Sequence, residues 1–432
     1  MKAAAGADPL REMLRKPEYR KALVFCALIG VPVSLVAFWF LAGLHEVQHL
    51  LWESWPHHLG WSRPPWWWPF PPLAVAGVAV GSVVKWLPGR GGHVPAGGLH
   101  PGGTTVRALP GIVLAAVAGL PLGVVLGPEA PLIALGGGLA LLFRDLARAP
   151  ASQQGDTLLT AAGSGAAIAV IFGNPLVAAV LLMEVAGVGG PQLFAVMLPA
   201  LLCCGIGSVV FTGFGRWTGL KTGSLSIGLP APPVLDTGDV VWSILAGVVI
   251  GVVVHRITAG GVWVAVRAAA RPLPVAVVCA LATAGCAALY TAATGRTPAD
   301  VVLSGQSALG ELAGDPHAWS VGALFAVLAF KGIGYTLCLG SLRGGPIFPA
   351  VFLGGAAGVL MAPLPGFGLV PAMAAGMGAA VVAALRLPIS GTVLVVLLLG
   401  HSGSIPVIVL AAVTAFMTAE LLPLPRHPVP SG

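Results

Sequence analysis

Long apolar stretches fill almost the whole chain, and short runs of Gly, Pro and charged residues interrupt them. Apolar stretches of this length favour helices in a lipid environment over strands. Several are shorter than the roughly 20 residues that a helix needs to cross the hydrocarbon layer, which is typical of broken or re-entrant helices. The pattern predicts helices near residues 22–53, 72–88, 107–126, 129–143, 157–172, 175–187, 191–214, 238–258, 273–293, 318–341, 347–361, 370–385, 388–400 and 405–422.

Composition agrees with this pattern. Of the 432 residues, 57% are hydrophobic and only 9% are charged, and the mean hydropathy is +0.93, whereas soluble domains are about 25% charged. The sequence therefore predicts an all-α polytopic membrane protein, with the lipid bilayer as a partner. The net charge of +7 does not indicate a nucleic-acid partner, because the basic residues are not clustered with aromatic ones. The six cysteines form no CxxC pair, so we expect no metal site and no cofactor.

Basic residues near the start predict the orientation of the chain. Six Lys and Arg lie within residues 1–21, which indicates a cytoplasmic N-terminus and a multi-pass protein of the inner or plasma membrane. We expect the following organisation: a basic N-terminal segment at 1–21, a first membrane repeat at 22–216, a linker at 217–237, a second membrane repeat at 238–422 and a disordered tail at 423–432.

The expected repeats rest on an internal duplication. The stretch "GPEAPLIALGGGLALL" from Gly127 aligns without gaps with "GPIFPAVFLGGAAGVL" from Gly345, and "GSGAAIAVIFGNPLVAAVLL" from Gly163 aligns with "GMGAAVVAALRLPISGTVLV" from Gly376. The two offsets are nearly equal, at 345 − 127 = 218 and 376 − 163 = 213. Paired short segments interrupted by Gly and Pro mark the substrate site in many transporters. We therefore expect the two Gly-Pro segments to face each other.

Each Gly-Pro segment has the chemistry of an anion site. A helix that begins just after the proline presents unpaired N–H groups and about half a positive charge. Two such ends that converge on a cavity would bind an anion. The candidate donors are the backbone amides of Glu129, Ala130, Ile347 and Phe348. The other interpretation is that the two segments simply begin two buried helices.

Glu129 is a carboxylate in an otherwise apolar segment. At a helix start it can occupy the donors that a permeating anion would use, and it would leave them when protonated, so we predict a gating role. A structural carboxylate that complements the helix dipole is the alternative. Glu184 is a candidate for an inner proton path or a structural hydrogen bond. Lys331 could neutralise a carboxylate or add positive potential, and His93 could line a pathway or simply be solvated.

These motifs together resemble the CLC family of chloride channels and chloride/proton exchangers over about residues 20–422. "GPEAP" resembles the family motif GxEGP and places Glu129 at its gating glutamate, "GPIFP" resembles GxFxP, and "GGHVP" at 91–95 resembles GSGIP. The resemblance adds Gly92, His93 and Val94 to the anion-binding candidates. It implies a fold of two inverted repeats and one anion pathway in each subunit of a homodimer. It also places dimer-interface regions within 163–187 and 376–400.

The chain departs from the family pattern at several positions. Gly92 replaces the serine of GSGIP, and Ile347 replaces the phenylalanine of GxFxP. Val185 occupies the place of the exchangers' inner proton glutamate, next to Glu184. The family's pore tyrosine has no counterpart on a final helix, because Tyr19, Tyr290 and Tyr335 lie elsewhere.

The expected function is passive conduction of chloride or another small anion, gated by Glu129. A chloride/proton antiporter and a fluoride exporter remain open as alternatives. We expect no enzyme and no catalytic residues. No GxSxG motif is present, and the stretch "HEVQH" at residues 45–49, although it matches the letters of the HExxH pattern, lacks the further ligand that a metalloenzyme site needs. His45 and His49 share a helix face, but a third metal ligand is not evident.

Overall fold

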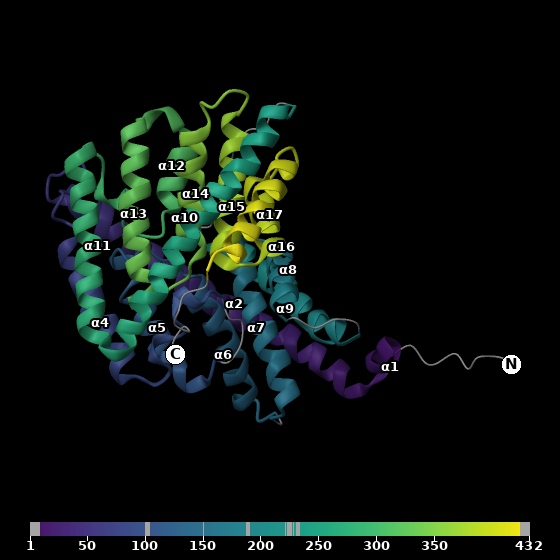
Figure 1. Cartoon of the computed structure of the whole chain (residues 1–432). Coiled ribbons are helices and arrows are strands. Elements are labelled where there is room, and N and C mark those ends of the chain that lie inside the picture. The colour runs from purple at the N-terminus through teal and green to yellow at the C-terminus, as the bar shows by residue number, and fades with distance from the viewer. Residues whose placement is uncertain are drawn as a thin grey trace. The chain divides into compact units, whose positions relative to one another are not determined.

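The computed structural model describes residues 9–99, 104–149, 151–186, 191–220, 222, 227, 229 and 234–423 (Figure 1). Helices make up nearly all of its regular structure, and the exception is one isolated antiparallel bridge. The all-α prediction is therefore confirmed for this part of the chain. Residues 1–8 of the predicted basic segment, residues 424–432 of the predicted tail and much of the predicted linker lie outside the described residues.

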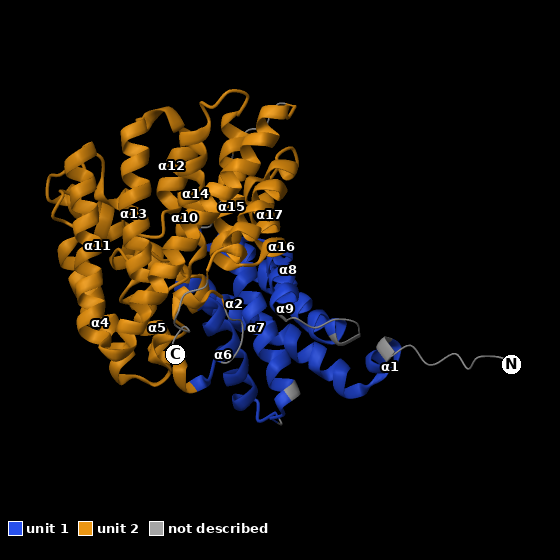
Figure 2. Ribbon diagram, in the orientation of Figure 1, with its two compact units in different colours: residues 1–40, 101–106, 132–220 blue, residues 41–100, 107–131, 221–432 orange. Residues whose placement is uncertain are grey.

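The chain divides into two units, which Figure 2 shows in different colours. The first unit consists of residues 1–40, 101–106 and 132–220. It contains α1 (Pro9–Arg15), most of α2 (Pro17–His49), all but the start of α6 (Glu129–Leu146), α7 (Gln153–Phe172), α8 (Pro175–Ala186) and α9 (Pro191–Thr218). Within it, α9 packs against α7 and α8. The predicted repeats at 22–216 and 238–422 are a different division of the chain, and their bounds stay a prediction.

The second unit consists of residues 41–100, 107–131 and 221–432 and carries the candidate site. Its helices include η1 (Leu50–Ser54), α3 (Trp55–His58), α4 (Phe70–Trp86), η2 (Pro88–Gly91), η3 (Pro95–Gly97), α5 (Leu109–Val117), η5 (Leu120–Leu122), α10 (Thr237–Ala270), α11 (Pro272–Thr294), η6 (Pro298–Asp300), α12 (Gln306–Gly314), η7 (Pro316–Ala318), α13 (Val321–Ser341), α14 (Ile347–Met361), α15 (Leu369–Leu385), α16 (Pro388–Leu399) and α17 (Ile405–Leu421); η4 (Val106–Ala108) joins the two units. In this unit α13 packs against α10, α11 and α14.

Local sequence explains where many helices begin and end. Ser152 caps α7 by accepting a hydrogen bond from the Gly155 amide, and Ser320 caps α13 in the same way. Asp236 and Asp239 form a capping box at the start of α10. Glycines with left-handed backbone follow α7, α11 and α16, because only glycine adopts this conformation without steric cost.

Three predicted helices differ from the structure. The helix predicted at 107–126 ends at Val117, and the chain then passes through η5 into a non-helical segment, because Gly119, Pro121 and Gly123 interrupt the helical ladder. The helix predicted at 318–341 begins at Val321, and a separate α12 precedes it. The helix predicted at 238–258 extends to Ala270, since its glycines pack against neighbouring helices rather than ending it.

The internal duplication is visible in how helices pack. In the first unit, a Cβ added to Gly136 of α6 would overlap the carbonyl oxygen of Gly163 in α7. In the second unit, a Cβ added to Gly354 of α14 would overlap the carbonyl of Gly376 in α15. These glycines occupy corresponding positions of the two aligned segments. Each unit therefore uses the same backbone contact between a re-entrant helix and the helix that follows it.

Six stretches of the described chain are long and apolar enough to cross a membrane. They are Pro17–His58, Gly155–Phe172, Leu193–Thr218, Thr237–Ala270, Pro272–Thr294 and Val321–Ser341. The apolar helices α14, α15, α16 and α17 have between 12 and 17 residues and are shorter than a full span. The chain is thus a multi-pass membrane protein with broken helices, as the sequence predicts.

Candidate functional site

The two Gly-Pro turns lie side by side in the second unit. The Gly127 amide donates to the Gly345 carbonyl at 2.8 Å, and the Gly345 amide donates back to Gly127 at 2.6 Å. These two hydrogen bonds satisfy the backbone of both turns just before α6 and α14 begin. The N-termini of both helices therefore lie next to each other. The sequence duplication led us to expect this proximity, and the two hydrogen bonds show it.

Glu129 is the first residue of α6, and its side chain is fully buried between the two turns. The Phe348 amide donates to its Oε1 atom at 2.8 Å. The backbone amides of Ile347 and Glu129 itself also donate to the carboxylate. Its Oε2 atom has no hydrogen-bond partner among the described residues. The carboxylate thus occupies a cradle of backbone N–H groups on one side and has an uncompensated oxygen on the other.

Glycine is required at both turns because the carboxylate lies directly against them. A Cβ built on Gly127 or on Gly345 would overlap the carboxylate oxygens of Glu129. A side chain at either position would therefore expel the carboxylate from the cradle. The Gly residues make the space, and the helix ends supply the donors.

One face of α13 holds the turns that form the cradle. Tyr335 is fully buried, and its hydroxyl donates to the carbonyl of Pro346, the residue before α14, at 2.7 Å. Three residues further along, the thiol of Cys338 accepts a hydrogen bond from the backbone amide of Val125, in the non-helical segment before α6. Residues four and three apart share a helix face. The cradle is therefore supported by side chains from a helix that contributes no donor to it.

Lys331 lies one turn before Tyr335 on the same face of α13 and is fully buried. Its Nζ atom donates to the carbonyls of Asp300, Val301, Val302 and Leu303 at 3.1–3.2 Å. It also lies 4.9 Å from the centre of the Phe352 ring. Backbone carbonyls thus bind the ammonium directly, and its charge also interacts with the nearby Asp300 carboxylate, so neutralisation of a carboxylate by Lys331 stays a prediction.

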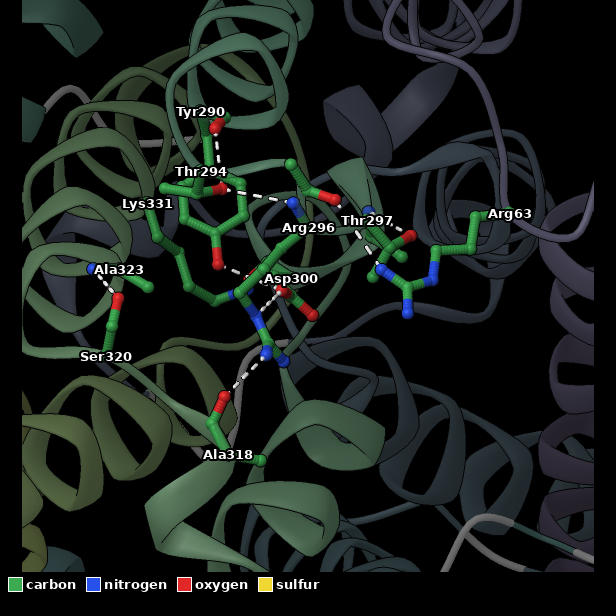
Figure 3. A network of polar contacts seen from close by, with 12 residues as sticks. Arg63, Tyr290, Thr294, Arg296, Thr297, Asp300, Ala318, Ser320, Ala323 and Lys331 are labelled. Carbon is green, nitrogen blue, oxygen red and sulfur yellow. Dashed lines mark hydrogen bonds and ion pairs between the residues drawn. The ribbon is translucent and has the colours of Figure 1, made fainter.

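Figure 3 shows the polar network around this loop. The Asp300 carboxylate accepts hydrogen bonds from the Tyr290 hydroxyl and from Arg296 Nε, both at 2.9 Å. Arg296 also donates to the Ala318 carbonyl and stacks on the Trp319 ring. Burial raises the pKa of the Asp300 carboxyl, and the nearby Arg296 opposes that rise. The network fixes the loop between α11 and α12 at one end of α13.

Two cavities with shared lining residues lie on this side of the unit. The larger, of about 320 Å³, is lined by charged and polar residues that include Arg63, Arg296 and Glu311. The smaller, of about 40 Å³, reaches Pro128, the residue before Glu129. Both cavities are lined by Gln48 and Gln306. The smaller cavity therefore brings polar side chains such as Gln48, Ser304 and Gln306 close to the turn before Glu129.

The other predicted residues are less closely associated with the cradle. Ala130 follows Glu129 in α6, while the amides that donate to the carboxylate are those of Glu129, Ile347 and Phe348. Gly92, His93 and Val94 form a separate turn, in which Gly92 lies against Ile112 and His93 is exposed. Glu184 lies on α8 in the first unit, so its part in a proton path stays a prediction.

Sequence reasoning did not assign Tyr335 or Arg343 to the site. Tyr335 was set aside because it does not lie on a final helix, and only the path of α13 brings it to Pro346. A signal for Arg343 was present, because it is a lone charge two residues before Gly345. Its guanidinium is buried, and it donates to the carbonyls of Arg90 and Leu342.

Comparisons with known proteins concern the family and the fold of the chain. The family model described as voltage gated chloride channel matches residues 92–420. Among curated proteins, YfeO of Salmonella choleraesuis, which its name assigns to ion transport, is 32% identical over 160 residues, which is 36% of this chain. YfeO of Escherichia coli O6:H1 is 32% identical over 157 residues, again 36% of this chain. The matched regions span only 38% and 37% of those two relatives.

Solved structures share the fold at low sequence identity. A slow cyanobacterial Cl−/H+ antiporter has a TM-score of 0.76 at 18% identity, with 92% of this chain and 94% of the other covered. A CLC-type fluoride/proton antiporter has a TM-score of 0.70 at 19% identity, with 92% and 95% covered. Because the family model matches well over half of its residues, this chain belongs to the voltage gated chloride channel family, the CLC family.

Proposed function

We propose that this protein moves chloride or another small anion across a membrane, passively, and that Glu129 gates the pathway. The observation that carries the proposal is the buried carboxylate in a cradle of backbone amides. Backbone N–H groups at converging helix ends stabilise an anion without a full cation, which would hold it too tightly to release it. The carboxylate occupies the place of such an anion.

Protonation is the step that would open the cradle. Hydrogen bonds to an ionised carboxylate are roughly twice as strong as those to a neutral group. A proton on Glu129 removes the charge that the three amides stabilise, and within the described part of the chain Oε2 has no partner to replace them. The neutral side chain leaves, and the same amides then bind a permeating anion. In this proposal the proton reaches Glu129 from the side of the small cavity that Pro128 lines.

The experiment is chloride flux from proteoliposomes at several pH values. Wild-type flux is expected to rise as the pH falls, and Glu129→Gln is expected to show high flux with little pH dependence. Glu420→Gln is the matched control. It makes the same chemical change at a residue of α17 whose carboxylate forms an ion pair with Arg386. Acid activation that persists unchanged in Glu129→Gln would refute the gating role.

Coupled chloride/proton exchange is the second candidate function. It is favoured by the two structural neighbours, which are named as antiporters. Passive conduction is favoured by Val185, because valine can neither donate nor accept a proton, and consecutive helical residues point about 100° apart, so Glu184 faces another direction. A pH electrode decides between them: proton movement against its gradient, driven by a chloride gradient at clamped voltage, would establish the antiporter. A fluoride exporter would carry fluoride in preference to chloride in the same vesicles.

A homodimer is part of the proposal. Leu176 and Met183 on α8 are 57% and 42% exposed, and Ile389 on α16 is 62% exposed, so each unit offers apolar side chains to lipid or to a second copy. We expect Leu176→Trp or Ile389→Trp to weaken crosslinking between subunits. Full crosslinking in both variants would show that these faces are not the interface.

A further inference from the structure

A further cavity of the second unit is lined by several positively charged side chains. It has a volume of about 140 Å³, and Lys85, Arg90 and Arg343 line it together with Val94 and Ser341. None of the described residues that line it is acidic. Its walls come from the C-terminal ends of α4, α10 and α13, and from the start of α11.

This cavity lies at the opposite end of α13 from the cavity beside Arg296. Gly340 and Ser341, which line it, are the last residues of α13, whereas Arg296 contacts Ala318, just before α13 begins. A helix of 21 residues is about 31 Å long, which is about the thickness of the hydrocarbon layer. The two cavities therefore lie at opposite ends of a helix that is long enough to cross a membrane.

Arg343 carries a charge that the described protein does not balance. It is 5% exposed, its Nε donates to the Arg90 carbonyl at 3.0 Å, and its Nη1 donates to the Leu342 carbonyl at 3.1 Å. Both acceptors are neutral, and no ion pair of Arg343 with a carboxylate occurs within the described ranges. Burial, and then the nearby Arg90, lower the pKa of Arg343 to about 10, so the group stays charged at neutral pH. A buried charge without a counter-charge is costly.

We propose that this cavity is an anion-recruitment site, in which Lys85, Arg90 and Arg343 bind a small inorganic anion, partly hydrated, before it moves to the Glu129 cradle. This inference rests on the proposed function. A water molecule occupies about 30 Å³ of liquid, so the cavity has room for a monatomic anion and a few waters. Only two residues of chain, at most about 7 Å, separate Arg343 from Gly345, which lies against the Glu129 carboxylate. The Val94 turn, predicted to bind anions, lines the same cavity.

The test removes one charge at a time at the exposed edge of the cavity. Lys85→Gln and Arg90→Gln leave the buried Arg343 and its hydrogen bonds in place. Arg267→Gln is the matched control, because it removes the same charge near the same end of α10, where the guanidinium stacks on Trp263 instead of lining the cavity. Half-saturating chloride is measured twice: for flux into proteoliposomes, and for the chloride-dependent rise of the unfolding temperature in detergent, with gluconate keeping the ionic strength constant.

Lys85→Gln and Arg90→Gln are each expected to raise the half-saturating chloride concentration roughly fivefold, the effect of losing a unit charge about 4 Å from the anion in a watery environment. Lys85→Arg keeps the charge and should have the wild-type half-saturating concentration. Arg267→Gln should match wild type. If Lys85→Gln and Arg90→Gln behave like Arg267→Gln in both measurements, the recruitment site is refuted, while a changed pH response in Glu129→Gln would still support the proposed function. If wild type carries no anion flux, the proposed function fails, and the unfolding measurement alone then decides whether this cavity binds chloride.

Discussion

Removing one oxygen atom tests how the cradle is held. Tyr335→Phe keeps the ring in its buried place and deletes only the hydroxyl that donates to the Pro346 carbonyl at 2.7 Å. Pro346 is the N-cap of α14, and the carbonyl of an N-cap residue also accepts the first hydrogen bond of its helix. The carbonyl thus keeps one partner in the variant. An unpaired buried polar group costs about 1–3 kcal/mol, so we expect the variant to lose stabilising free energy near the lower end of that range.

A loss of about 1 kcal/mol corresponds to roughly a fivefold change in an equilibrium constant. If the hydroxyl sets the direction of the Ile347 and Phe348 amides, its removal lowers the free energy of chloride binding as well as the free energy of unfolding. We therefore expect Tyr335→Phe to weaken chloride binding by up to roughly fivefold and to lower the unfolding temperature modestly. Calorimetric titration of chloride into the purified protein measures the first effect, and thermal unfolding in detergent measures the second.

Tyr19→Phe is the control for this prediction. The Tyr19 hydroxyl also donates to a backbone carbonyl, that of Ala195 at 3.1 Å, but in the first unit. This variant loses the same atom and should leave chloride binding at the wild-type value. If Tyr335→Phe also binds chloride like wild type, the hydroxyl does not position the donors, even if stability falls.

Two further predictions concern the frame around the site. Lys331→Met removes the donor shared by the carbonyls of residues 300–303 and should cost about 3 kcal/mol of unfolding free energy; thermal unfolding at the wild-type temperature would contradict this. Gly354→Ala should destabilise the protein by about 1–3 kcal/mol, because the new methyl group would overlap the Gly376 carbonyl. Gly285→Ala is its control, since nothing lies within 4 Å of that position, and it should be neutral or stabilising by up to about 1 kcal/mol.

The sequence determined the features that depend on local chemistry. Apolar length and low charge predicted an all-α membrane protein, and the aligned Gly-Pro segments predicted two short helices whose N-termini begin at Glu129 and Ile347. These features follow from the chain alone, because a helix start needs only its own cap, proline and unpaired amides. The same reasoning was wrong about the end of the helix at 107–126. The apolar pattern continues to residue 126, but the helix ends at Val117, before Gly119 and Pro121.

Only the tertiary structure decided which groups meet. The antiparallel bridge between Gly127 and Gly345 joins residues 218 positions apart, and it selects the Ile347 and Phe348 amides as partners of Glu129. The role of Tyr335 depends on the path of α13 past Pro346. Contacts of this kind depend on how helices cross, and helix crossing is set by the close approach of glycines in separate segments rather than by any local pattern.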